Sequence, residues 1–204
     1  MTSTRVDADA LTRAPSAPVL RYGGSEVVRI LLVATQFGAA AVHAAVVREH
    51  LDHWPTAGLF FVLLAVAGFA VGTALLRRVD ALRLLAALAL SVGPLLVWLV
   101  SRTAGLPFGP EAGVPEQVGL TDAAACLLEL AGVGAALILL RPAPRLRDRA
   151  LPAAAQLAGL GLVAAVTVVG LTSAAVVHPA HAEDSPHGHV GSGHGSGVEI
   201  GEHS

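Results

Sequence analysis

Apolar residues fall in five long windows along this chain, separated by polar or charged segments. The windows cover residues 27–47, 57–76, 81–100, 118–140 and 153–177. A helix of about 20 apolar residues crosses a hydrocarbon core of roughly 30 Å. The pattern therefore predicts an all-α integral membrane protein built as a five-helix transmembrane bundle.

The polar flanks divide the chain into three parts. We expect a disordered cytoplasmic arm at 1–26, a membrane domain at 27–177 and a disordered tail at 178–204, because the flanks hold too few large apolar residues to form a core. The whole chain is 54% hydrophobic and only 14% charged, which is typical of a membrane protein and excludes an ordinary soluble domain.

The arginines predict the orientation of the bundle. The chain contains no lysine, and of its thirteen arginines only Arg48 and Arg102 fall in the first and third connections, while the tail has none. Basic residues collect on the cytoplasmic side, so we expect the N-terminus inside and the C-terminus outside a bacterial inner membrane. All nine histidines then lie at or beyond the outer half of the bilayer. The chain has no contiguous basic patch, so we expect no nucleic-acid partner.

Polar side chains share one face on each of two predicted spans. On the first span they are seven residues apart, and on the fourth they follow i, i+4, i+7 spacing. Polar groups at membrane depth are costly and are therefore pointers to function. This intramembrane polar stripe consists of Gln36, His43, Asp122, Cys126 and Glu129.

Counting residues from the outer ends of the spans predicts how the stripe is paired. His43 and Asp122 fall in the outer third, and Gln36 and Glu129 fall near the middle, so antiparallel neighbours would bring each pair together. Three interpretations stay open: polar groups that join two helices, a ligand, metal or proton site, or two faces that never meet. Cys126 fits a small buried residue better than a metal ligand.

The first connection carries a candidate metal site. Glu49, His50, Asp52 and His53 are adjacent, and the histidines stand at i, i+3 if the helix continues. Imidazole with carboxylate suits Zn²⁺, Cu²⁺ or Ni²⁺. A solvated helix end explains the same residues equally well.

The third connection predicts a fixed turn. Residues 101–110 hold two prolines and two glycines, which restrict the backbone. Arg102 is the only base in this connection, and it is placed to pair with Asp122 or Glu116. Such a pair would brace the loop against the bundle.

The outer connections also carry a resemblance. The residues concerned are His43, Glu49-His50, Trp54, Gly58, Phe60-Phe61, the string Ser101-Arg102-Thr103-Ala104-Gly105-Leu106-Pro107-Phe108-Gly109-Pro110, Glu116 and Asp122. In these the chain resembles a family of uncharacterised multi-pass membrane proteins common in high-GC actinobacteria, over about residues 28–140. The resemblance implies a membrane fold and a bacterial source, and it implies no known chemistry.

The tail is rich in histidine. Flexible imidazoles can collect Cu²⁺, Ni²⁺ or Zn²⁺, with affinity that falls below about pH 6.5 as they protonate. A solvated low-complexity tail and a pH sensor are the other interpretations. The six tail histidines are His178, His181, His187, His189, His194 and His203.

The sequence leaves three functions open and shows no enzyme signature. The leading hypothesis is a protein that binds Cu, Zn or Ni outside the membrane through the tail, His50 and His53, and passes ions toward His43, Asp122 and Glu129. In that scheme the intramembrane polar stripe would be a second site or a proton relay. The main alternative is a structural or assembly subunit that packs with other membrane subunits. A b-type haem bound by His43 is weaker, because the sequence offers no second histidine at that depth.

Overall fold

The protein is a bundle of long helices. The computed structural model describes residues 24–141 and 152–177, and within them every regular element is an α-helix. Each helix is long and apolar enough to cross a membrane, so the predicted all-α fold with five helices that could span a membrane is confirmed. The helices are α1 (Gly24–His53), α2 (Pro55–Arg77), α3 (Ala81–Thr103), α4 (Leu120–Leu140) and α5 (Ala153–Val177).

The first helix is longer than its apolar window predicts. α1 begins at Gly24 and continues to His53, whereas the apolar window ends at residue 47 and predicted a loop after it. The helix continues beyond the apolar window because residues 48–53 include neither Gly nor Pro, the two residues least compatible with a helix. Pro55 is the first residue of α2, where a backbone N–H would have no helical acceptor in any case, so its missing N–H costs no hydrogen bond. Trp54 is the only residue between the two helices.

The bundle has two ends. The Trp54 end contains Trp54 and the α3–α4 loop at 104–119, and the Arg77 end contains the short α2–α3 connection. Of the predicted arm only residues 24–26 are described, and they belong to α1. The predicted tail at 178–204 lies outside the described residues.

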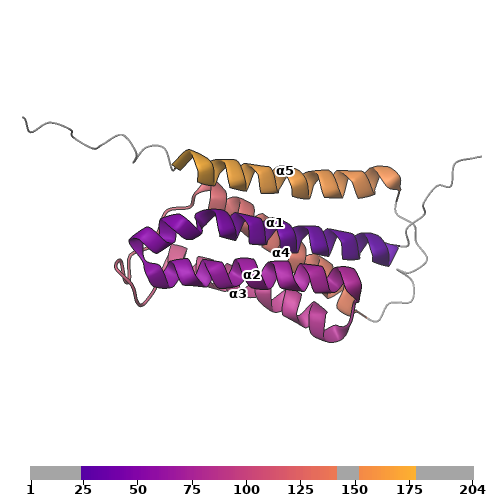
Figure 1. The fold of residues 1–204 in the computed structure, drawn as a ribbon, viewed down its shortest axis with the longest axis horizontal. Coiled ribbons are helices and arrows are strands. Elements are labelled where there is room, and N and C mark those ends of the chain that lie inside the picture. The colour runs from indigo at the N-terminus through magenta and orange to yellow at the C-terminus, as the bar shows by residue number, and fades with distance from the viewer. Residues whose placement is uncertain (1–23, 142–151, 178–204) are drawn as a thin grey trace, which may run out of the picture.

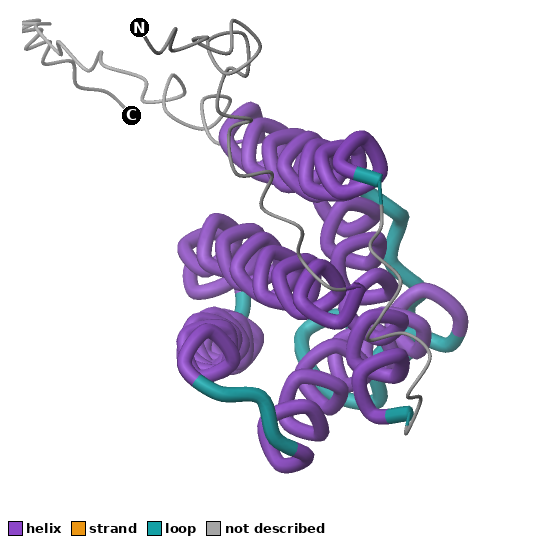
Figure 2. Tube along the Cα trace, turned by 90° about the vertical axis from the view of Figure 1, so that its right-hand side faces the viewer, coloured by secondary structure: helices purple, strands orange, loops and turns teal. Residues whose placement is uncertain are grey.

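Helix α1 occupies the centre of the bundle. It packs against α2, α4 and α5, while α3 packs against α2 and α4. Half of the apolar window of α1 is buried, compared with 11% of that of α5. Accordingly α5 lies at one edge, alongside α1, in both views (Figure 1) and (Figure 2).

Small residues allow α1 and α2 to approach closely. A Cβ atom at Gly68 would lie 2.9 Å from the Cβ of Ala40, and one at Gly72 would lie 2.6 Å from the ring of Phe37. Apolar burial gives little preference for a helix over a lipid tail in a membrane, so close backbone approach is what favours this contact. The outer face of α2 carries large exposed apolar side chains, as lipid contact requires: Leu59, Leu63 and Val66.

Candidate functional site

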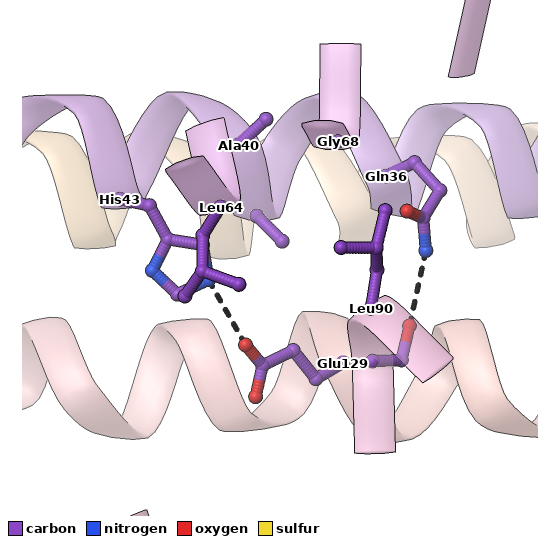
Figure 3. Close-up of a pocket in the computed structure, with 9 residues that line it drawn as sticks. Gln36, Ala40, His43, Leu64, Gly68, Leu90 and Glu129 are labelled. Atoms are coloured by element: carbon purple, nitrogen blue, oxygen red, sulfur yellow. Dashed lines mark hydrogen bonds and ion pairs between the residues drawn. The ribbon is translucent and has the colours of Figure 1, made fainter. Parts of the chain in front are cut away.

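The middle of the bundle holds a buried pair of titratable side chains (Figure 3). His43 of α1 is 6% exposed and Glu129 of α4 is 3% exposed, and 3.0 Å separates His43 Nε2 from Glu129 Oε1. His43 stands ten residues before the end of α1, and Glu129 stands nine residues after the start of α4. Both therefore lie about 15 Å along their helices from the Trp54 end, at similar heights in the bundle.

Packing alone does not require this pair. A single charge at this depth costs about 2.5–3.5 kcal/mol on insertion scales, and apolar side chains of similar volume would fill the space as well or better. The hydrogen bond between the imidazole and the carboxyl group offsets this cost, because each group satisfies the other. The buried His–Glu pair is therefore a candidate functional site, since apolar packing would be the simpler way to fill the same space.

A second polar contact lies one to two turns further toward the Arg77 end. Gln36 Nε2 donates to Ser91 Oγ of α3 at 3.0 Å and is 3.4 Å from the carbonyl oxygen of Ala87. Gln36 and Ser91 are both buried. The contact depends on Gly132 of α4, where a Cβ atom would lie 2.8 Å from Ser91 Oγ.

Three residues of the intramembrane polar stripe, Gln36, His43 and Glu129, line one cavity, while Asp122 pairs with Arg102 instead. The partners also differ from those the sequence predicted. The expected pairs His43–Asp122 and Gln36–Glu129 are wrong: His43 pairs with Glu129, and Gln36 pairs with Ser91. The error arose because depth was counted from the end of the apolar window at residue 47. The six extra residues of α1 place His43 deeper, level with Glu129.

A small cavity adjoins the pair. Its volume is about 10 Å³, close to the minimum that one water molecule needs. Polar side chains from α1, α3 and α4 line it together with apolar groups. The lining residues are Gln36, Ala39, Ala40, His43, Leu64, Gly68, Leu90, Ser91 and Glu129.

An aromatic ring separates the buried histidine from the next one along α1. The Phe61 ring of α2 has its centroid 5.7 Å from that of His43 and 4.4 Å from that of His50. The two histidines are seven residues apart, or about 10.5 Å along the helix axis. Phe61 thus fills the interval between them.

At the Trp54 end, Arg102 bridges two acidic residues. Its guanidinium donates to Glu116 in the α3–α4 loop and to Asp122 in the first turn of α4. Asp122 Oδ2 also accepts from the backbone N–H of Gly119 at 3.0 Å, which caps α4. The sequence predicted either partner for Arg102, and the structure brings it to both.

The same loop packs over the turn between α1 and α2. The Phe108 and Trp54 rings meet edge to face, with centroids 5.8 Å apart. Gly109 has φ +103°, and a Cβ atom there would lie 2.8 Å from the Trp54 ring. This contact explains why the loop needs glycine at this position.

The other predicted ligands are only partly assembled. His50 and His53 share the last turns of α1, but the described segments contain no group of three His, Cys, Asp or Glu side chains able to hold a metal ion. Cys126 is half-buried one turn from Glu129 and is a free thiol. The six tail histidines lie outside the described residues.

The geometry around His43 bears on the haem hypothesis. Its Nε2 atom is bonded to Glu129, and the adjoining cavity holds about 10 Å³. An iron porphyrin at His43 would require α1 and α4 to separate, so this packing does not favour that alternative.

Sequence reasoning missed Ser91, Phe61 and Gly132 as parts of the site. Ser91 gave the clearest signal, because it is a lone hydroxyl in the apolar centre of the third window. Phe61 and Gly132 gave none, since apolar and small residues occur throughout these helices.

Comparison of the chain with protein families, with curated proteins and with solved structures finds no match. Its function is therefore inferred from the residues and their geometry.

Proposed function

We propose that this protein binds a divalent transition metal at the Trp54 end, which faces the outside of a bacterial inner membrane. The observation that carries the proposal is the bonding of His50 and His53. His50 Nδ1 lies 2.8 Å from the carbonyl oxygen of Val46, and His53 Nδ1 lies 3.0 Å from that of Glu49.

These contacts set the tautomer of both rings. A carbonyl oxygen only accepts, so each Nδ1 atom is the one that carries the hydrogen. Each neutral ring then keeps its lone pair on Nε2, which is the arrangement found in metal-binding histidines whose other nitrogen donates to a backbone carbonyl. Two imidazoles one turn apart are thus prepared as ligands.

The remaining ligands must come from elsewhere. A structural Zn²⁺ site takes four, and Cu²⁺ and Ni²⁺ also accept imidazole with oxygen donors. Glu49 and Asp52 lie on the same helix end, and the tail supplies six further histidines. The positive-inside distribution of arginine supports placing all of these groups on one side of the membrane.

Metal content tests the proposal. The full-length, untagged protein would be loaded separately with Zn²⁺, Cu²⁺ or Ni²⁺, washed, and measured by mass spectrometry beside two variants, His50→Gln/His53→Gln and a six-fold tail His→Gln variant. We expect near-stoichiometric metal that is lost with His50 and His53. Retention in the double variant with loss in the tail variant would move the site to the tail, and no metal in any form would refute the proposal.

A structural or assembly subunit is the second candidate, and one observation favours it. The intramembrane contacts His43–Glu129 and Gln36–Ser91 satisfy polar groups entirely within the bundle. In this alternative the polar groups define how helices fit together and bind nothing. Stable co-purification with another membrane protein, together with absence of metal, would support it.

A further inference from the structure

We propose that the His43–Glu129 pair, together with the cavity beside it, is a proton-binding site inside the bundle, and that Phe61 closes it toward the Trp54 end. The proposal does not depend on metal binding at His50 and His53. It rests on the pair, the cavity and the position of one aromatic ring.

Charge favours one proton in the pair. With one proton shared between imidazole and carboxylate the pair is neutral overall, whichever residue carries it. Loss of this proton would leave a negative charge at mid-bundle, and gain of a second would leave a positive one. Both charged states are costly where water is excluded. The pair therefore keeps one proton, which it can exchange, and rarely loses it or binds a second.

The cavity can supply a carrier for that proton. Its volume of about 10 Å³ is close to the minimum for a single water molecule, and a buried water needs two to four polar partners. Ser91 Oγ accepts from Gln36 and still has a hydroxyl hydrogen to give. The side chains of Gln36, His43 and Glu129 also line the cavity and supply further polar groups.

Phe61 separates this site from His50. Its ring contacts both histidine rings and spans the interval between them along α1. A phenyl ring neither donates nor accepts a proton, so transfer from His50 to His43 requires that the ring move or that water pass around it. The rate of exchange with the Trp54 end should therefore depend on Phe61.

Few other titratable groups face the pair. Cys126 and then Asp122 lie toward the Trp54 end on α4, with Arg102 on α3 beside Asp122. His50 is the neighbour on α1. Within its described range α5 carries no titratable side chain, and α2 carries only Arg77, at the opposite end of the bundle.

Nuclear magnetic resonance on full-length protein with ¹⁵N-labelled histidine, in phosphatidylcholine nanodiscs, tests the proposal. We expect a ring N–H resonance of His43, identified by its loss in His43→Gln, that is protected from exchange with water and does not titrate with the exposed histidines. Phe61→Ala should speed its exchange severalfold. Phe60→Ala removes a neighbouring ring of equal size, whose ring contact in the described structure is with Phe61, and it should leave the exchange unchanged.

Two results would overturn the proposal. One is a His43 ring that titrates with bulk pH as the exposed histidines do, which would mean that the pair holds no proton of its own. The other is equal exchange in Phe61→Ala and Phe60→Ala. If His43→Gln does not fold, Glu129→Asp can be used to assign the His43 resonance, because this variant keeps a carboxylate and should shift the same resonance. Absence of that shift would also count against the site.

Discussion

His43 Nε2 lies 3.0 Å from Glu129 Oε1, although 86 residues separate the two in the chain. This contact joins α1 to α4 at the middle of the bundle. This contact is costly to leave half-made, since removal of one partner strands the other away from water.

Removal of either partner should destabilise the protein, and the two losses should differ. His43→Leu leaves a carboxyl group buried without a partner, whereas Glu129→Leu leaves an imidazole, which has an uncharged form that is less costly to bury. We expect His43→Leu to cost about 3–5 kcal/mol and Glu129→Leu less, with the double variant costing less than the sum. Unfolding in mixed detergent measures all three, with Glu111→Leu in the exposed loop as control. Simple additivity would mean that the two residues are not coupled.

Gly132 should be intolerant of a side chain because of its contact with Ser91. A Cβ atom at Gly132 would lie 2.8 Å from Ser91 Oγ, whereas one at Gly134 would meet nothing within 4 Å. Gly132→Ala should therefore lower the unfolding free energy, while Gly134→Ala should raise it by up to about 1 kcal/mol through helix propensity. Adding Ser91→Ala to Gly132→Ala should restore part of the loss. No restoration would show that the clash lies elsewhere.

The two acidic partners of Arg102 should not be equivalent. The Glu116 side chain is 48% exposed, so solvent screens its ion pair, whereas Asp122 also caps α4 through Gly119. We expect Asp122→Ala to cost about 1 kcal/mol and Glu116→Ala at most a few tenths. Thermal unfolding of the two variants at low salt makes the comparison. A larger loss for Glu116→Ala would contradict it.

Substitutions at two glycines of the α3–α4 loop should distinguish a steric clash from backbone strain. Gly109 and Gly113 both have positive φ, but only at Gly109 would a Cβ atom strike Trp54, at 2.8 Å. Gly109→Ala should displace the loop and red-shift the emission of Trp54, measured in a Trp98→Phe background. Gly113→Ala should cost stability through backbone strain alone and leave the emission unchanged. Equal spectra for both variants would contradict the Trp54 contact.

The proposed orientation can be tested with cysteine labelling. In a Cys126→Ser background, the Ser204→Cys variant should react with a membrane-impermeant maleimide in intact cells, and the Ser3→Cys variant should react only after lysis. The reverse pattern would put the histidine tail inside and remove the outer-face metal proposal.

The sequence determined the number and approximate position of the helices. Apolar windows long enough to span a bilayer have few other solutions, because every backbone polar group in lipid must be satisfied within the chain. It also identified most of the polar side chains that form the site, since a histidine or carboxylate in an apolar window is conspicuous.

The tertiary structure decided which of those side chains meet. Apolarity marks membrane depth and not the end of a helix, so the apolar windows could not predict the extension of α1 to His53, and the partner of His43 proved to be Glu129 rather than Asp122. Ser91 reaches Gln36 only because Gly132 lets α4 approach, and close approach of three helices is a property of the packed bundle. The residues of the site could thus be chosen from the sequence, while their partners followed from helix register and packing.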